Sequence, residues 1–317
     1  MKYSYLFLVS AGLLTFAACS DKNDAEIADE SEEYVLLNEV TATIQPRMVS
    51  EAGSTRGVVQ DLSDNRLSYY WESGGSIVVV PQAEAAVRSY TITSDMVADS
   101  SVLKIPTSVW RYKTGLSYYA VYPYFTDSLF TVSDYDCYYY TMPEQVQSGN
   151  GSTSHITPEL DPLVSEPTKP SDWTLSFSMK HMFMLVNFQL VCSEDVTYHS
   201  LDLKQEESNN FYYSSGLFRM WQDGYPYLYG SISPVSSDCI RLSFDEPVSV
   251  TAEDTLDAFM LVPPFIIKNY SQQNVPLVLE ATVTQQEDIY TATADLGTWS
   301  YEPNTLKVFF SNMTVQH

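Results

Sequence analysis

No set of residues in this sequence has the spacing of a recognisable catalytic motif. Nucleophile elbows, phosphate-binding loops, HExxH pairs and GxGxxG turns are all absent. Asp61, Asp64 and Asn65 could ligate calcium, but they lack the spacing of a dedicated calcium loop, and turn formation is the better interpretation. No two of the histidines have metal-ligand spacing: His155, His181, His199 and His317. We therefore expect no catalytic residue, no metal and no cofactor, and hence no enzymatic activity.

The thiol of Cys19 is placed for one defined chemical step, the attachment of a lipid. Lys2 gives a positive amino end, an apolar run covers residues 5–14, and Ala17 and Ala18 precede the cysteine. This order is typical of a bacterial lipoprotein signal peptide, here residues 1–18, whose cysteine becomes the first residue after cleavage. The run is too short to cross a hydrocarbon core of about 30 Å, so a transmembrane anchor is the weaker alternative. We expect an exported chain attached to lipid through Cys19.

The charge of the chain limits its partners. Its formal net charge is −24, with 16 basic and 40 acidic residues. Nucleic acid is excluded as a partner, because binding it requires Lys and Arg to neutralise phosphates. Residues 19–33 are acidic and almost free of apolar side chains, and we expect them to form an extended tether, with an acidic export signal as the alternative.

Three further cysteines lie in apolar or aromatic runs, at Cys137, Cys192 and Cys239. Their wide spacing matches no zinc pattern. Buried free thiols are the preferred interpretation, and one disulfide with a spare thiol is the alternative.

The elements that must carry these residues are predicted to be strands. Tyrosine is abundant, at 24 residues, and no segment shows a sustained helical period. In residues 34–44, alternation places Leu36, Val40, Ala42 and Ile44 on one face. The clearest alternation is in residues 275–285. Short strands separated by Pro and Gly turns predict an all-β fold of antiparallel β-sandwiches.

The stretch 145–172 changes in composition and suggests a domain boundary. It is rich in Ser, Gly, Thr and Pro, and it fits either a disordered linker or a long ordered crossover between domains. We place the boundary at 168, which gives an N-terminal domain of residues 34–168 and a C-terminal domain of residues 169–317. His181, at the start of an apolar strand, is expected to be a packed histidine or one at the seam between domains, and not a catalytic residue.

An ordered set of short motifs resembles the fimbrillin family of Bacteroidota, the subunits of type V pili, over nearly the whole chain. No single motif is strong. The motifs are the signal ending at Cys19, Thr55-Arg56, the W-x-x-G-type turn and strand at 71–79, the aromatic run 118–124, Phe177 to His181, and Met260 to Pro264. Gly75 stands where the family pattern has an acid, and only residues 309–317 remain as a C-terminal strand to donate.

The resemblance implies two tandem β-sandwich domains of the transthyretin-like, Greek-key kind and an outer-membrane lipoprotein at the cell surface. It further implies that a trypsin-like protease cuts after an arginine behind the first strand, and that a strand from another fimbrial subunit fills the opened groove. Carried onto this chain, residues 34–44 are removed, with Arg56 as the preferred cut and Arg47 as the second choice. The expected role is a structural or tip subunit of a fimbrium that serves cell adhesion.

A second function stays open from the sequence. A permanently anchored surface lipoprotein could use an exposed patch of its many Tyr and Trp rings to bind glycan or a host or bacterial surface ligand. Aromatic residues also fill sandwich cores, so their number alone does not favour this alternative.

Overall fold

A computed structural model describes a chain built of strands. The described residues are 34–51, 71–82, 88–97, 101–108, 110–123, 137–205, 212–222, 225–228, 235–263, 274–300 and 304–316. They contain 22 strands and no helix, so none of them forms a helix able to span a membrane. The prediction of an all-β fold is confirmed.

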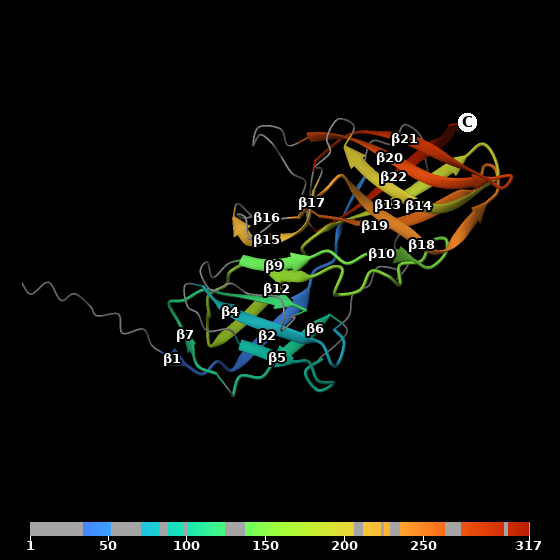
Figure 1. The fold of residues 1–317 in the computed structure, drawn as a ribbon. Coiled ribbons are helices and arrows are strands. Elements are labelled where there is room, and N and C mark those ends of the chain that lie inside the picture. The colour runs from blue at the N-terminus through green and yellow to red at the C-terminus, as the bar shows by residue number, and fades with distance from the viewer. Residues whose placement is uncertain are drawn as a thin grey trace, which may run out of the picture.

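Seven strands form the lower sheet in Figure 1, which runs from blue to green. In spatial order they are β5 (Arg88–Thr91), β4 (Ser76–Pro81), β8 (Tyr118–Tyr122), β11 (Leu163–Ser165), β12 (Thr174–His181), β2 (Glu39–Ile44) and β6 (Val102–Ile105). The first strand of this sheet along the chain, β2, is therefore an internal strand of the sheet.

Nine strands form the second sheet, at the upper right in Figure 1. In order they are β10 (Gln145–Gln147), β18 (Cys239–Val250), β14 (Val196–Gln205), β20 (Asn274–Gln285), β21 (Asp288–Ser300), β22 (Thr305–Gln316), β13 (Met184–Cys192) and β19 (Thr255–Val262), and β3 (Met48–Glu51) pairs with β22. The alternation predicted for 275–285 is observed, because Leu277, Leu279, Ala281 and Val283 are all buried.

Six strands form two smaller sheets. β1 (Tyr34–Val35) pairs with β7 (Tyr112–Lys113). The other sheet contains β16 (Tyr225–Leu228), β15 (Tyr212–Gln222), β17 (Val235–Ser237) and β9 (Cys137–Thr141).

The sheets are mixed, in contrast to the purely antiparallel arrangement expected from the sequence. β2 is parallel to β12, β10 to β18, and β22 to both β13 and β3. Parallel neighbours need a long crossover connection, and each of these pairs joins segments far apart in the chain. The expectation of antiparallel sheets came from turn signals between consecutive strands. Such signals cannot reveal pairs of strands that are distant in the chain.

Two cores lie within the sheets, and a third apolar cluster joins them. β4 and β8 are buried on both faces: Ile77 and Val79 face the first core, whereas Val78 and Val80 face the joining cluster. That cluster also contains Leu185, Phe259, Leu261, Leu306 and Val308 from β13, β19 and β22. We call this cluster, which lies between the two large sheets, the sheet junction.

The chain changes sheet after His181. β12 lies in the seven-stranded sheet, where Leu175, Phe177 and Met179 enter the first core. The next strand, β13, starts at Met184 and belongs to the nine-stranded sheet. This point lies beyond the boundary at 168 that composition suggested, because β12 must pair with β2. The stretch 145–172 is an ordered crossover, one of the two alternatives left open, and its β10 belongs to the nine-stranded sheet. The division into two domains stays a prediction.

Candidate functional site

The candidate site is the N-terminal strand segment, residues 34–51, and the sheet positions that it occupies. β2 pairs with β12 over six residues and with β6 over four, so it has a hydrogen-bonded neighbour on each side. Backbone bonds extend beyond the strand at both ends, from Asn38 N to Trp173 O at 2.7 Å and from Gln45 N to Met179 O at 2.8 Å. The segment therefore completes the seven-stranded sheet.

One face of β2 enters the first core. Val40, Ala42 and Ile44 are buried there, as alternation predicted. Leu36, which the sequence placed on the same face, is 52% exposed, while Leu37 is buried. The chain bends at Asn38 between β1 and β2, so the period of two does not continue across the bend. The apolar face of this strand therefore consists of three residues, without Leu36.

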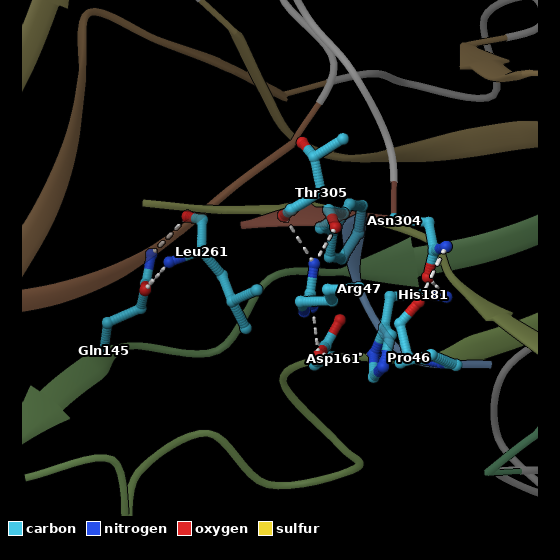
Figure 2. A network of polar contacts seen from close by, with 9 residues as sticks. Pro46, Arg47, Gln145, Asp161, His181, Leu261, Asn304 and Thr305 are labelled. Atoms are coloured by element: carbon cyan, nitrogen blue, oxygen red, sulfur yellow. Dashed lines mark hydrogen bonds and ion pairs between the residues drawn. The ribbon is translucent and has the colours of Figure 1, made fainter. Parts of the chain in front are cut away.

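Directly after β2 the segment crosses to the other sheet, and Arg47 lies at the crossing. The Arg47 side chain is only 3% exposed. Its Nη1 donates to the carbonyl oxygens of Phe183 at 2.6 Å and Thr305 at 3.1 Å, and its Nη2 forms an ion pair with Asp161 Oδ2 (Figure 2). One guanidinium thus connects the start of β13, the start of β22 and the loop before β11.

The buried carboxylate of Asp161 contacts both Arg47 and His181. His181 Nδ1 lies 2.9 Å from the same Oδ2 of Asp161. Burial by itself would raise the pKa of Asp161, but the charges of Arg47 and His181 outweigh it and hold this pKa at about 2. Burial, with added repulsion from Arg47, lowers the pKa of His181 to about 4, although Asp161 opposes the shift. At neutral pH the site therefore holds a charged Arg–Asp pair and a neutral imidazole.

Asn304 holds the backbone of the segment on both sides of Arg47. Its Oδ1 accepts from His181 N at 3.1 Å, its Nδ2 donates to Pro46 O at 3.4 Å, and its carbonyl accepts from Met48 N at 3.0 Å. The φ of Asn304 is 56°, a left-handed conformation that asparagine tolerates better than most residues. We call Arg47, Asp161, His181 and Asn304 the Arg47 cluster.

The segment ends in the second sheet. β3 pairs in parallel with the start of β22, from Met48 opposite Thr305 to Glu51 opposite Val308. In Figure 1 the blue chain leaves β2 and passes from the lower sheet toward the upper one. The N-terminal strand segment thus supplies one strand to each large sheet, with the Arg47 cluster between them.

Side-chain amides cover the edge of β19, the last strand in the order of the nine-stranded sheet. Gln145 accepts from Leu261 N at 2.7 Å and donates to Leu261 O at 2.9 Å (Figure 2). Gln147 accepts from Phe259 N at 2.8 Å and donates to Asp257 O at 2.9 Å. Both amides are buried and take the place of the backbone of a neighbouring strand.

Asn150 continues this series by accepting from Asp257 N at 2.6 Å and donating to Thr255 O at 3.0 Å. We call Gln145, Gln147 and Asn150 the amide ladder. Because β10 also pairs with β18, the ladder connects the two ends of the nine-stranded sheet. An open strand edge is a template for unwanted pairing, and the ladder removes that template at β19.

We expect Gln147→Leu to lower the free energy of unfolding by about 1–3 kcal/mol, because it leaves the buried Phe259 N–H without its partner. Urea unfolding measures the change. Val146, exposed between the two glutamines, gives the control: Val146→Ala should change stability by less than about 0.5 kcal/mol. Equal effects of the two variants would contradict a stabilising role for the ladder.

Two segments of the family-like pattern meet in the structure. The rings of Trp71 and Tyr122 contact edge to face, with centroids 5.0 Å apart. A Cβ atom at Gly75 would lie 2.7 Å from the Tyr122 hydroxyl oxygen, so this position has no room for a side chain unless Tyr122 moves. The W-x-x-G-type turn and the aromatic run therefore form one packing unit.

The other predicted site residues have different outcomes. His181 is a packed histidine at the sheet junction, as predicted. Cys192 is a buried free thiol, and Cys239 is a half-buried one. Cys19, Arg56, Asp61, Asp64 and Asn65 lie outside the described residues. Within the described ranges no group of three or more His, Cys, Asp or Glu side chains could hold a metal.

Sequence reasoning missed Asp161, Asn304 and the amide ladder. Asp161 had one signal, because it is a carboxylate inside the otherwise apolar run 160–164. Gln145 and Gln147 are buried around an exposed Val146, which inverts the usual alternation and was also readable. Asn304 gave no signal in its local sequence.

Comparisons with known proteins give distant structural likenesses. No family model matches the chain, and no curated protein matches its sequence. A Bacteroides ovatus structure named "putative cell adhesion protein" aligns with 90% of this chain and 96% of its own, at 15% identity and a TM-score of 0.47. A Bacteroides uniformis structure of the same name aligns with 87% and 94%, at 11% identity and a TM-score of 0.46.

A structure named as a fimbrial protein from Bacteroides ovatus aligns with 88% of this chain and 50% of its own, at 11% identity and a TM-score of 0.36. These structural neighbours are thus Bacteroides proteins named for cell adhesion or fimbriae, at low sequence identity.

Proposed function

We propose that this chain is a non-enzymatic fimbrial subunit that matures by losing its N-terminal strand segment and accepting a strand from another subunit. One observation carries the proposal: β2, the first strand of the seven-stranded sheet along the chain, is an internal strand and has its apolar face in the core. All residues before β2 lie on its N-terminal side, so a single backbone cut after the segment separates it covalently from the rest of the chain. A freed segment leaves a slot between β12 and β6 with the shape of an extended strand.

The free energies of burial fit a strand that is bound firmly and can still be replaced by another strand. Full burial of Val40 and Ile44 is worth about 1.5–3 kcal/mol each, before any cost of ordering a new strand. The backbone hydrogen bonds to β12 and β6 set the register of the strand more than they add to its affinity. A donor with the same apolar spacing would regain both contributions.

The cut is proposed at Arg56. The guanidinium of the second choice, Arg47, is enclosed by Phe183, Thr305 and Asp161, and a protease needs that side chain in its specificity pocket. A cut after Arg56 would release β2 and β3 together, so that both large sheets lose a strand. A cut after Arg47 would leave β3 paired with β22.

The remaining parts of the proposal rest on the sequence. Cys19 would carry the lipid that holds the precursor at the outer membrane, and the two large sheets would correspond to two tandem transthyretin-like domains. Partners would be other fimbrial subunits, with a host or bacterial surface ligand at the exposed end. β22 is paired along its length with β13 and at its end with β21, which favours an accepting tip or accessory subunit over a donating stalk subunit.

The test is limited digestion of the purified chain with a trypsin-like protease. We expect one stable product whose amino end is Gly57, followed by oligomers that resist mild heating. Arg56→Ala should abolish both the product and the oligomers, whereas Lys180→Ala, at a half-buried surface position, should leave them unchanged. Scattered cleavage without assembly would contradict the proposal.

A further inference from the structure

Removal of the N-terminal strand segment takes a cation as well as a strand out of the molecule. Arg47 lies three residues after Ile44, and both proposed cuts remove it together with β2. Asp161 remains behind, fully buried, and within the described residues its Oδ2 contacts Arg47 and His181 while its Oδ1 accepts no hydrogen bond. A buried carboxylate that loses its cation is strongly destabilising.

We propose that the slot selects its incoming strand by a basic residue, best an arginine, that enters the Arg47 position and pairs with Asp161. This inference rests on the proposed function, since it concerns the strand that replaces β2. The site offers Asp161 Oδ2 and the carbonyl oxygens of Phe183 and Thr305, which are three acceptors arranged around one guanidinium. Charge complementarity therefore adds to the apolar fit.

The neighbours of β2 define the rest of the pattern. Ala42 lies opposite Phe177 on β12 and Leu103 on β6, and all three are fully or almost fully buried. The middle position of the donor must therefore be small. Val40 and Ile44 flank it with larger side chains that are also buried. The expected donor carries apolar residues at positions i and i+4, a small residue at i+2, and a basic residue at i+7.

This pattern argues against β22 of a second copy as the donor. The described residues of β22, 305–316, contain a single cation, Lys307, near the start of the strand. No arginine or lysine follows its apolar positions at the required distance. The slot is therefore a better fit for a segment of a different subunit than for β22 of a second copy of this chain.

The experiment uses the complete chain with a site-specific protease sequence inserted after Arg56 and a fluorescent label on the N-terminal segment. After the cut, excess synthetic peptide 38–48 competes with the labelled segment. The series has Arg47 unchanged, Arg47→Lys or Arg47→Gln, and an Ala42→Asp peptide is the control for the apolar slot. Loss of label from the large fragment gives the rate of exchange and the relative affinities.

We expect the Arg47 peptide to bind about tenfold or more tightly than the Arg47→Gln peptide, with the Lys peptide between them. In an Asp161→Asn chain the difference should fall below about twofold; if that variant does not fold, the peptide series on the wild-type chain decides alone. Equal binding of the Arg and Gln peptides would overturn the cation requirement and leave strand replacement standing. No exchange with any peptide after complete cleavage would overturn strand replacement itself, and this inference with it.

Discussion

Replacing Arg47 by methionine is expected to lower the free energy of unfolding of the uncut chain by about 3–5 kcal/mol. The substitution keeps an unbranched side chain in place of the arginine stem but leaves the carboxylate of Asp161 buried next to an imidazole that is neutral at pH 7. It also removes the donors to the carbonyl oxygens of Phe183 and Thr305. Denaturant unfolding at pH 7 measures the loss.

Two controls separate this cost from a general effect of losing charge. Arg47→Met combined with Asp161→Leu should recover most of the stability, because an apolar replacement of a whole buried pair is often neutral or better. Lys180→Met breaks the exposed pair with Glu166, at 2.5 Å, and should cost less than about 1 kcal/mol. A similar loss for Arg47→Met and Lys180→Met would mean that Asp161 does not depend on Arg47.

The sequence was sufficient to predict most strands but not their partners. Alternation in 275–285 and in 39–44 reports which side chains are buried, and burial of Val40, Ala42 and Ile44 followed from it. Short strands such as β3 and β10 were not predicted, because three or four residues are too few to show a period. These strands form through pairing with β22 and β18. Parallel pairing of β2 with β12 depends on contacts between residues more than 130 positions apart in the chain.

The candidate site divides in the same way. Arg47 was identified by its residue type as a cleavage position, and its enclosure by carbonyl oxygens from distant segments could not be predicted from type. The position of His181 was predicted, because a histidine at the start of an apolar strand is normally packed. Its partner Asp161 was missed, because the two residues are 20 positions apart, which gives no local signal, and the carboxylate reaches His181 only after the crossover folds.

We expect a second large effect from pH, with His181 as its source. In the folded chain His181 takes up a proton only near pH 4, whereas an unfolded chain protonates it near pH 6.5. Between these values the unfolded state binds more protons, so this contribution to stability is complete above pH 6.5 and is lost as the pH falls toward 4. The loss is on the order of 3 kcal/mol, from about 1.4 kcal/mol per pKa unit. Urea unfolding at intervals between pH 7.5 and 4 measures it.

Two variants assign the effect to its group. Among the described residues, the charged groups that act on His181 are Asp161 and Arg47. The pKa of Asp161 is about 2, so its own contribution to stability is lost only below pH 3.8. His181→Gln should therefore flatten the profile between pH 6.5 and 4 and leave the loss below it. His155→Gln is the matched control, because burial also lowers the pKa of His155, and it should remove a smaller part. An unchanged profile in His181→Gln would exclude His181 as the source.

The same titration distinguishes the uncut chain from one that has lost its N-terminal strand segment. Arg47 is one of the causes that lower the pKa of His181, and Asp161 is the opposing one. When Arg47 leaves with the segment, only burial still opposes protonation, and the pKa of His181 must rise from about 4. NMR titration of the imidazole in the cut chain measures this rise, and return of the pKa toward 4 on addition of a strand that carries arginine would show that a new cation occupies the Arg47 position. A pKa of about 4 that stays unchanged after the segment is lost would mean that Arg47 does not control the charge of His181.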